Sequence, residues 1–241
     1  MYENIEELYK NYDRNDPVLA EYADLLYDEI LDLEQILKEE SAVVKDEHKY
    51  VDGIKPGAEE MAPAGHQWVY VFIVNAKEIT TKVIRHFTKQ PYNHAALSFD
   101  KSLTNMASFV MGPGFRRENI KNYKPEATFS LYKIAVPNDA VIVMKDAVNN
   151  IEQIKDPKEK YKYSLKGLIG FIDKRHQAKY NTNEKKMFCS QFVARMFATA
   201  GMKVFGDKKD YEIKPYDFAK NKNFKFCYRG MVKNYNPGRV R

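Results

Sequence analysis

Cysteine and histidine are scarce in this chain, and long apolar runs are absent. Only two cysteines occur in 241 residues, Cys189 and Cys227, which is too few for a disulfide framework. The chain contains no Cys-x-x-Cys pair, and its five histidines are scattered along the sequence. We therefore expect neither a zinc site nor any other metal or organic cofactor.

No apolar run is long enough to cross a bilayer, so the sequence predicts no transmembrane segment. The first ten residues, MYENIEELYK, are acidic and amphipathic, whereas a signal peptide begins with a basic and then an apolar region. The expected location of the chain as synthesised is the cytoplasm. A phage virion as its final location stays open.

Charge is distributed unevenly along the chain. Residues 1–60 contain 18 Asp and Glu against 6 Lys and Arg, a net charge of −12, although the whole chain carries +6. The remaining residues are therefore strongly basic, at +18. Their lysines are spread along the chain without a nucleic-acid-binding module, so we expect no nucleic-acid partner and interpret them as a solvated basic surface.

Three regions follow from the pattern of apolar residues and from Pro and Gly. Residues 1–44 predict an acidic amphipathic helical arm, because apolar side chains recur every three or four positions after the helix-start signal Asp16-Pro17. Residues 45–66 lack this periodicity and predict a linker. We expect residues 67–241 to form the catalytic domain. The arm cannot bury its apolar stripe alone, so it packs on that domain or on a protein partner.

Alternating and helical patterns divide the last region into strands and helices. The glycine-rich segment 111–115 lacks the Lys-Ser/Thr of a phosphate loop and predicts a mobile loop near the site. Expected strands cover residues 68–74, 94–99, 106–109, 129–136 and 224–228, and expected helices cover residues 77–87, 139–155 and 189–200.

Cys189 lies at the start of a predicted helix with a strongly apolar face. A thiol at a helix N-terminus experiences the positive end of the helix dipole, which favours the thiolate. The free backbone N–H groups there can also stabilise an oxyanion. The alternative is a buried structural cysteine, as most free cysteines are. Cys227 lies in an alternating strand pattern and is interpreted as structural.

His94 begins a predicted strand in which alternation places His94, Ala96 and Ser98 on one face. The small neighbours leave space beside the imidazole, which a general base requires. Taken alone, His94 could equally be a surface or turn histidine.

Together these segments resemble the circularly permuted NlpC-type (YiiX-like) branch of the papain-like cysteine hydrolases, in which the histidine strand precedes the cysteine helix. The resemblance spans residues 68–226 and leaves residues 1–60 outside it. The ordered series of motifs is more specific than any one of them. The matching segments are NHAALSFD (93–100), MASF (106–109), YKYSLKGLIGF (161–171), FCSQFVA (188–194) and KPYDF (214–218).

The resemblance implies that Cys189 is the nucleophile and His94 the base that accepts its proton. For the third, orienting group it points to Ser108, with Asn105 as second choice, and a serine orients an imidazole more weakly than a carboxylate does. The backbone N–H groups of Cys189 and Ser190 are expected to bind the oxyanion. Further candidates for substrate or oxyanion contacts are Gln191, Asn93 and Tyr92.

The expected fold is α+β, a small, mostly antiparallel sheet packed on the cysteine helix. The expected function is a cysteine peptidase or amidase that cleaves a peptide or peptidoglycan-type amide bond through a thioester. Two other functions stay open: a structural or virion protein that uses residues 1–44 to bind a partner, and a lipid acyl hydrolase or acyltransferase. The acidic arm could also cover the basic domain and inhibit it.

Overall fold

The computed structural model describes residues 60–75, 92–110, 113–156, 160–164, 167, 177–181 and 185–240. The chain divides into Met1–Val51 and Asp52–Arg241, and every described residue belongs to the second unit. The helices expected within residues 1–44 and 77–87, and most of the expected linker, lie outside the described residues.

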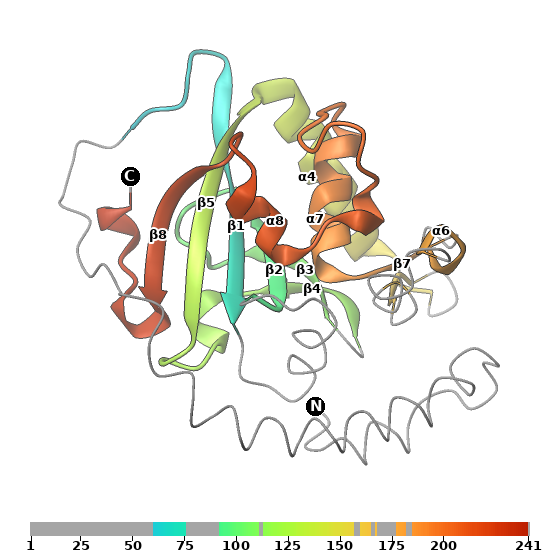
Figure 1. Cartoon of the computed structure of the whole chain (residues 1–241), viewed down its shortest axis with the longest axis horizontal. Coiled ribbons are helices and arrows are strands. Elements are labelled where there is room, and N and C mark those ends of the chain that lie inside the picture. The colour runs from blue at the N-terminus through green and yellow to red at the C-terminus, as the bar shows by residue number, and fades with distance from the viewer. Residues whose placement is uncertain are drawn as a thin grey trace. The chain divides into compact units, whose positions relative to one another are not determined.

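A six-stranded antiparallel sheet in the order β4-β3-β2-β1-β5-β8 forms the centre of the described unit, which is α+β as expected (Figure 1). A short parallel pair, β6 and β7, forms a separate sheet that contacts β3 and β4 through β6. The strands of the large sheet are β1 His66–Asn75, β2 His94–Ser98, β3 Met106–Val110, β4 Gly114–Glu118, β5 Thr128–Pro137 and β8 Lys225–Met231, and those of the pair are β6 Lys162–Tyr163 and β7 Lys186–Met187.

Helices α4 and α7 pack on one face of the large sheet, and α8 lies over β1 (Figure 1). Within the described part of the chain, no helix is long and apolar enough to cross a membrane. The α-helices are α4 Asn138–Gln153, α6 Gln177–Tyr180, α7 Cys189–Thr199 and α8 Pro215–Lys220, and the 3-10 helices are η1 Ile120–Asn122, η2 Asp210–Glu212, η3 Val232–Asn234 and η4 Pro237–Arg239.

Strand β1 holds the sheet together because it pairs with β5 along its whole length and with β2 from Tyr70 to Val74. Its consecutive apolar residues from Val69 to Val74 are buried on both faces, which explains why the segment lacks polar alternation. Val69, Val71 and Ile73 join the core beneath α4 and α7. The other face forms a second core, in which aromatic side chains of β1 and β5 meet those of the C-terminal segments.

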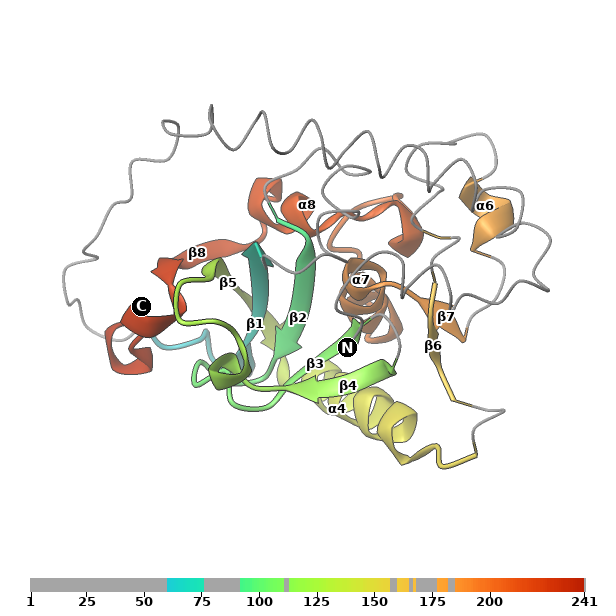
Figure 2. The same cartoon turned by 90° about the horizontal axis from the view of Figure 1, so that it is seen from below.

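The sheet twists strongly at the β3–β4 edge. Strands β2 and β3 share a single bridge, Leu97 with Ala107, whereas β3 and β4 pair over their full length. In Figure 2, β4 runs almost across the direction of β2. This twist brings the last residue of β4, Glu118, to the first residue of β2, His94, although the two are four residues out of register in a flat sheet.

The segment 111–115 was expected to be a mobile loop; residues 111–112 lie outside the described residues, and residue 113 is a turn. From Gly114 onward the chain is strand β4, and Gly114 itself adopts a φ of +76°, which glycine accommodates without strain. A Cβ at this position would overlap the Tyr161 carbonyl oxygen next to β6. The glycine therefore permits close approach of β4 to the β6 segment.

Candidate functional site

The imidazole of His94 forms an ion pair with a buried carboxylate. His94 Nε2 lies 2.9 Å from Glu118 Oε2, and the two residues are 9% and 3% exposed. The Tyr123 hydroxyl donates a hydrogen bond of 2.8 Å to the same oxygen, and Arg116 Nε lies 3.6 Å from the other carboxylate oxygen. The carboxylate of Glu118 is thus surrounded by three donors, which fix its orientation toward His94.

The electrostatics of this pair favour the doubly charged state. Burial lowers the pKa of His94, but the charge of Glu118 and hydrogen bonds to Cys189 and Glu118 raise it to about 10. Burial raises the pKa of Glu118, and its interactions with His94, Tyr123 and Arg116 outweigh this and hold it below its usual value. Near neutral pH, His94 is an imidazolium and Glu118 a carboxylate.

Cys189 is the first residue of α7 and is almost fully buried. The helix forms here because Phe192, Val193, Met196 and Phe197 share one face and enter the core beneath the sheet. The N-cap residue, Phe188, is extended and supplies no side-chain cap, and no acidic residue occupies the first turn. The positive end of the helix dipole is therefore not neutralised by the helix's own side chains, and it acts on the Cys189 sulfur.

Cys189 lies close enough to His94 to influence it, because its side chain is among the groups that raise the pKa of the imidazole. Nε2 of His94 is engaged by Glu118, so Nδ1 is the ring nitrogen left for the thiol. Thiol, imidazole and carboxylate then stand in the linear order of a nucleophile, its base and the group that orients the base.

A tyrosine hydroxyl lies beside this triad. Tyr163 belongs to β6, which pairs in parallel with β7 so that Tyr163 is opposite Met187, two residues before Cys189. Its hydroxyl is buried and has no hydrogen-bond partner within the part of the chain that the structure describes. Burial and the nearby Cys189 raise the pKa of Tyr163, so the phenol stays protonated and able to donate.

The structure does not bring Ser108 to His94. The Ser108 hydroxyl is buried on β3 and donates a hydrogen bond of 2.6 Å to the carbonyl oxygen of Ala95, and Asn105 lies exposed in the turn before β3. The side chain that contacts His94 is Glu118 on β4. The geometry therefore favours Glu118 over both sequence candidates for the orienting group.

The remaining sequence candidates have structural partners of their own. Ser190 Oγ donates to the Ile213 carbonyl oxygen at 2.7 Å. Gln191 is buried, its Nε2 lies 3.5 Å from Asp210 Oδ1, and its Oε1 has no partner among the described residues. The Asn93 amide is 3.4 Å from the Asn75 side chain, and the Tyr92 hydroxyl is 2.7 Å from Ser130 Oγ. None of these four side chains forms a hydrogen bond with Cys189 or His94 among the interactions that the structure describes.

Cys227 lies on β8 in the core on the opposite face of the sheet from α7. Burial raises the pKa of its thiol to about 12. This agrees with the structural role expected for it. Among the described residues, no group of three or more His, Cys, Asp or Glu side chains is arranged to hold a metal ion.

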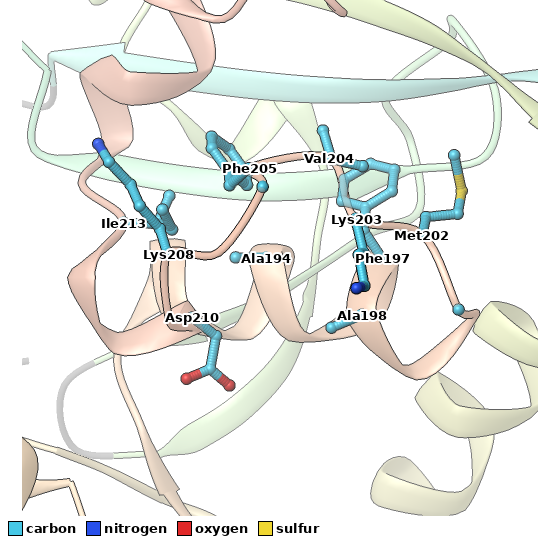
Figure 3. Close-up of a pocket in the computed structure, with 12 residues that line it drawn as sticks. Ala194, Phe197, Ala198, Met202, Lys203, Val204, Phe205, Lys208, Asp210 and Ile213 are labelled. Atoms are coloured by element: carbon cyan, nitrogen blue, oxygen red, sulfur yellow. The ribbon is translucent and has the colours of Figure 1, made fainter.

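A hollow of about 290 Å³ lies between the second half of α7 and the loop that follows it (Figure 3). Phe197, Val204 and Phe205 supply much of its apolar wall, and Asp210 at its edge is paired with Arg195 at 2.5 Å. The hollow contains none of the triad residues. Among the described residues, a cysteine, a histidine and a buried counter-charge come together only at Cys189, His94 and Glu118.

No protein-family model matches this chain, and no curated protein matches it significantly.

Proposed function

We propose that the protein is a cysteine hydrolase with Cys189 as nucleophile, His94 as proton carrier and Glu118 as the group that orients and charges His94. The single observation that carries this proposal is the buried His94–Glu118 pair at 2.9 Å, which lies next to a cysteine at a helix N-terminus. A buried charge pair is costly to desolvate, so its presence beside a thiol favours a chemical over a packing role.

The first half of the reaction forms a thioester. The Cys189 thiolate attacks the carbonyl carbon of an amide, and the carbonyl oxygen becomes an oxyanion. Backbone N–H groups of the first turn of α7 and the unpartnered Tyr163 hydroxyl are the donors available to stabilise it. The His94 imidazolium then gives its proton to the leaving nitrogen as the C–N bond breaks.

The second half returns the enzyme to its starting state. Neutral His94 takes a proton from water, the resulting hydroxide attacks the thioester, and the C–S bond breaks to release a carboxylic acid and the thiolate. The negative charge of the sulfur contributes to the raised pKa of His94, and the sulfur has no charge once it is acylated. Acylation therefore weakens the hold of His94 on its proton at the stage where it must act as a base.

For the fold, we propose the permuted papain-like arrangement that the sequence motifs resemble, since the His94 strand precedes the Cys189 helix in the chain. An amide in a peptide or a peptidoglycan-type compound is the proposed substrate class. The structural and virion alternative depends on residues 1–44, which lie outside the described residues, and no feature of the described site favours acyl transfer from lipids.

The test is the rate of Cys189 alkylation by iodoacetamide against pH, in a Cys227→Ser background. We expect alkylation near pH 6.5 to be at least about tenfold faster than that of free cysteine, because the His94 imidazolium and the helix N-terminus both stabilise negative charge on the sulfur. His94→Ala should remove this advantage. In a peptide-hydrolysis screen, the His94→Ala variant should lose the activity that the parent chain shows. A rate equal to that of free cysteine, or one indifferent to His94→Ala, would refute the proposal.

A further inference from the structure

Strand β5 extends beyond its outer neighbour, β8. The last pair between the two strands joins Lys133 to Lys225, whereas β5 continues to Pro137. In Figure 1, this end of β5 passes the start of β8 on its way to α4. Among the residues that the structure describes, the outer edge of β5 therefore has no partner strand at Ala135.

The backbone N–H and C=O of Ala135 point to this free edge. On the β1 side of β5, the Asn138 N–H donates to the Gly65 carbonyl oxygen, and on the β8 side the Val232 N–H donates to that of Ala127. The hydrogen-bonding direction alternates along a strand, so the odd-numbered residues of β5 face outward. Within the described part of the chain, neither backbone group of Ala135 has a hydrogen-bond partner.

A hollow of about 460 Å³, which we call the edge hollow, lies beside Ala135. Trp68 lines it from the face of the sheet that is turned away from α7. Ile134, Met202 and Val204 line it from the α7 face, and Figure 3 shows the last two where they also border the smaller hollow. Its size lies within the range of about 300–1,000 Å³ found for ligand pockets. No triad residue lines it.

The Trp68 side of the edge hollow is cationic. Lys133 and Lys225 share the carboxylate of Glu60, at 3.0 and 2.5 Å. Their Nζ atoms lie 4.3 and 5.3 Å from the centre of the Trp68 ring, whose N–H donates a hydrogen bond of 2.8 Å to the Glu60 carbonyl oxygen. Two lysines against one glutamate leave this side with a net positive charge. Lys203 also lines the hollow, and no acidic residue does so among the described residues.

We propose that the edge hollow binds an extended peptide segment of another protein, which adds a short antiparallel strand to β5 with an acidic residue opposite Ala135 and an apolar residue on each side of it. A free N–H and C=O on a strand edge are the groups that such a peptide pairs with. Every pair in the large sheet is antiparallel, which favours that direction for the added strand.

The two faces of the sheet determine this order of side chains. Residues opposite each other on neighbouring strands point to the same face. Trp68 is opposite Ala135, and Lys225 is opposite Lys133, two residues earlier, so the peptide residue opposite Ala135 points toward this cationic side. The residues before and after it point to the other face, where Ile134 and other apolar side chains form the wall.

The test measures the binding of acetyl-GVDVG-amide to the full chain by the fluorescence of Trp68, which is the chain's single tryptophan. We expect a saturable change in fluorescence, and a dissociation constant about fivefold higher for acetyl-GVKVG-amide, whose central lysine is repelled by the lysines beside Trp68. No saturable change with the first peptide, or equal dissociation constants for the two peptides, would overturn the proposal.

Backbone pairing is tested by changing the peptide and leaving the protein as it is. N-methylation of the central aspartate removes the N–H that donates to the Ala135 carbonyl oxygen, and should raise the dissociation constant at least about tenfold. N-methylation of the next valine is the matched control, because in an antiparallel pair its N–H points away from β5, and should change the constant less than about threefold. Equal effects of the two modifications would exclude strand addition at Ala135.

Two lysine variants test the charge preference. Lys225→Gln should weaken binding of the aspartate peptide about threefold. Lys124→Gln is its matched control, since Lys124 is exposed before the opposite end of β5 and should leave binding unchanged. If Lys225→Gln left the ratio of the two peptides' dissociation constants as in the parent chain, the acidic preference would be refuted.

The inference goes beyond the proposed hydrolase function and does not depend on it. Cys189→Ala should bind the aspartate peptide as the parent chain does, because no triad residue lines the edge hollow. Peptide binding together with an unreactive Cys189 in the parent chain would support the docking site and refute the hydrolase. A reactive Cys189 without saturable peptide binding would refute the docking site alone.

Discussion

Replacing Glu118 with Gln tests the charge pair at the centre of the site. Glutamine has the shape of glutamate and can still accept a hydrogen bond from His94, but it removes the buried negative charge 2.9 Å from the imidazole. Tyr123 and Arg116 then face a neutral amide in place of a carboxylate. The substitution therefore changes electrostatics with little change in packing.

The expected magnitude follows from the pKa of His94. A pKa of about 10, against an ordinary 6.5, favours the folded imidazolium by on the order of 5 kcal/mol, shared between Glu118 and Cys189. Removing one member of a buried ion pair costs about 3–5 kcal/mol. We expect Glu118→Gln to lower the free energy of unfolding by about 3 kcal/mol at its largest.

The effect of Glu118→Gln on stability should depend on pH in a direction that the two pKa shifts determine. Because the pKa of His94 is raised on folding, its stabilisation is fully present below pH 6.5 and is lost as the pH rises toward about 10. Because the pKa of Glu118 is lowered on folding, its contribution is present above its ordinary value of 4.5 and is lost in more acid solution. The difference in free energy of unfolding between the parent chain and Glu118→Gln should be greatest between about pH 4.5 and pH 6.5, and it should decrease toward pH 10.

Urea unfolding at several pH values, followed by circular dichroism, measures this difference. Glu126→Gln is the matched control, since Glu126 is exposed in the turn before β5 and should change stability by less than about 0.5 kcal/mol at any pH. If the difference in free energy of unfolding were the same near pH 6 and near pH 9.5, the substitution would not act through the interaction of Glu118 with His94. A variant as stable as the parent throughout would refute the buried charge pair itself.

Three further outcomes are expected. Tyr123→Phe keeps the ring but loses the hydrogen bond to Glu118, and should cost about 1–2 kcal/mol in urea unfolding near pH 6; no change would mean that the hydroxyl does not hold the carboxylate. Gly114→Ala should lower the free energy of unfolding by more than about 2 kcal/mol, because the added Cβ would overlap a backbone carbonyl. Gly65 has a similar positive φ but open space around it, so Gly65→Ala should cost only about 1 kcal/mol. Equal effects of the two variants would exclude the clash. Cys227 should resist iodoacetamide near pH 8 in the native chain, as its pKa of about 12 requires, and should react in guanidinium; mass-spectrometric detection of native modification would contradict the raised pKa.

The parts of the fold that the sequence predicted correctly are those with strong apolar patterns. The structure confirms strands and helices at residues 66–75, 106–110, 128–137, 138–153 and 189–199, within a few residues of the expected bounds. Burial on both faces makes β1 a continuous apolar run, and packing beneath the sheet gives α7 its helical periodicity. Such patterns are local, so they can be read without knowledge of the partner strand.

Strand β4 and Glu118 escaped prediction because their structure depends on distant residues. The segment Gly114-Phe115-Arg116-Arg117-Glu118 combines a glycine-rich start with three charges, which favours a loop by composition. One signal was present: alternation puts Arg116 and Glu118 on one face and Phe115 and Arg117 on the other. The second face meets α4 and the core, since Arg117 pairs with Glu152 and Phe115 packs on Phe192.

The contact of His94 with Glu118, and not with Ser108, changes the electrostatics expected of the site. A serine beside His94 would leave a buried imidazole with a pKa lowered by desolvation, and a neutral imidazole would not hold a thiolate near neutral pH. A carboxylate shielded by Tyr123 and Arg116 reverses this balance. The weak orientation expected from Ser108 no longer applies, because a buried carboxylate holds the imidazolium in place.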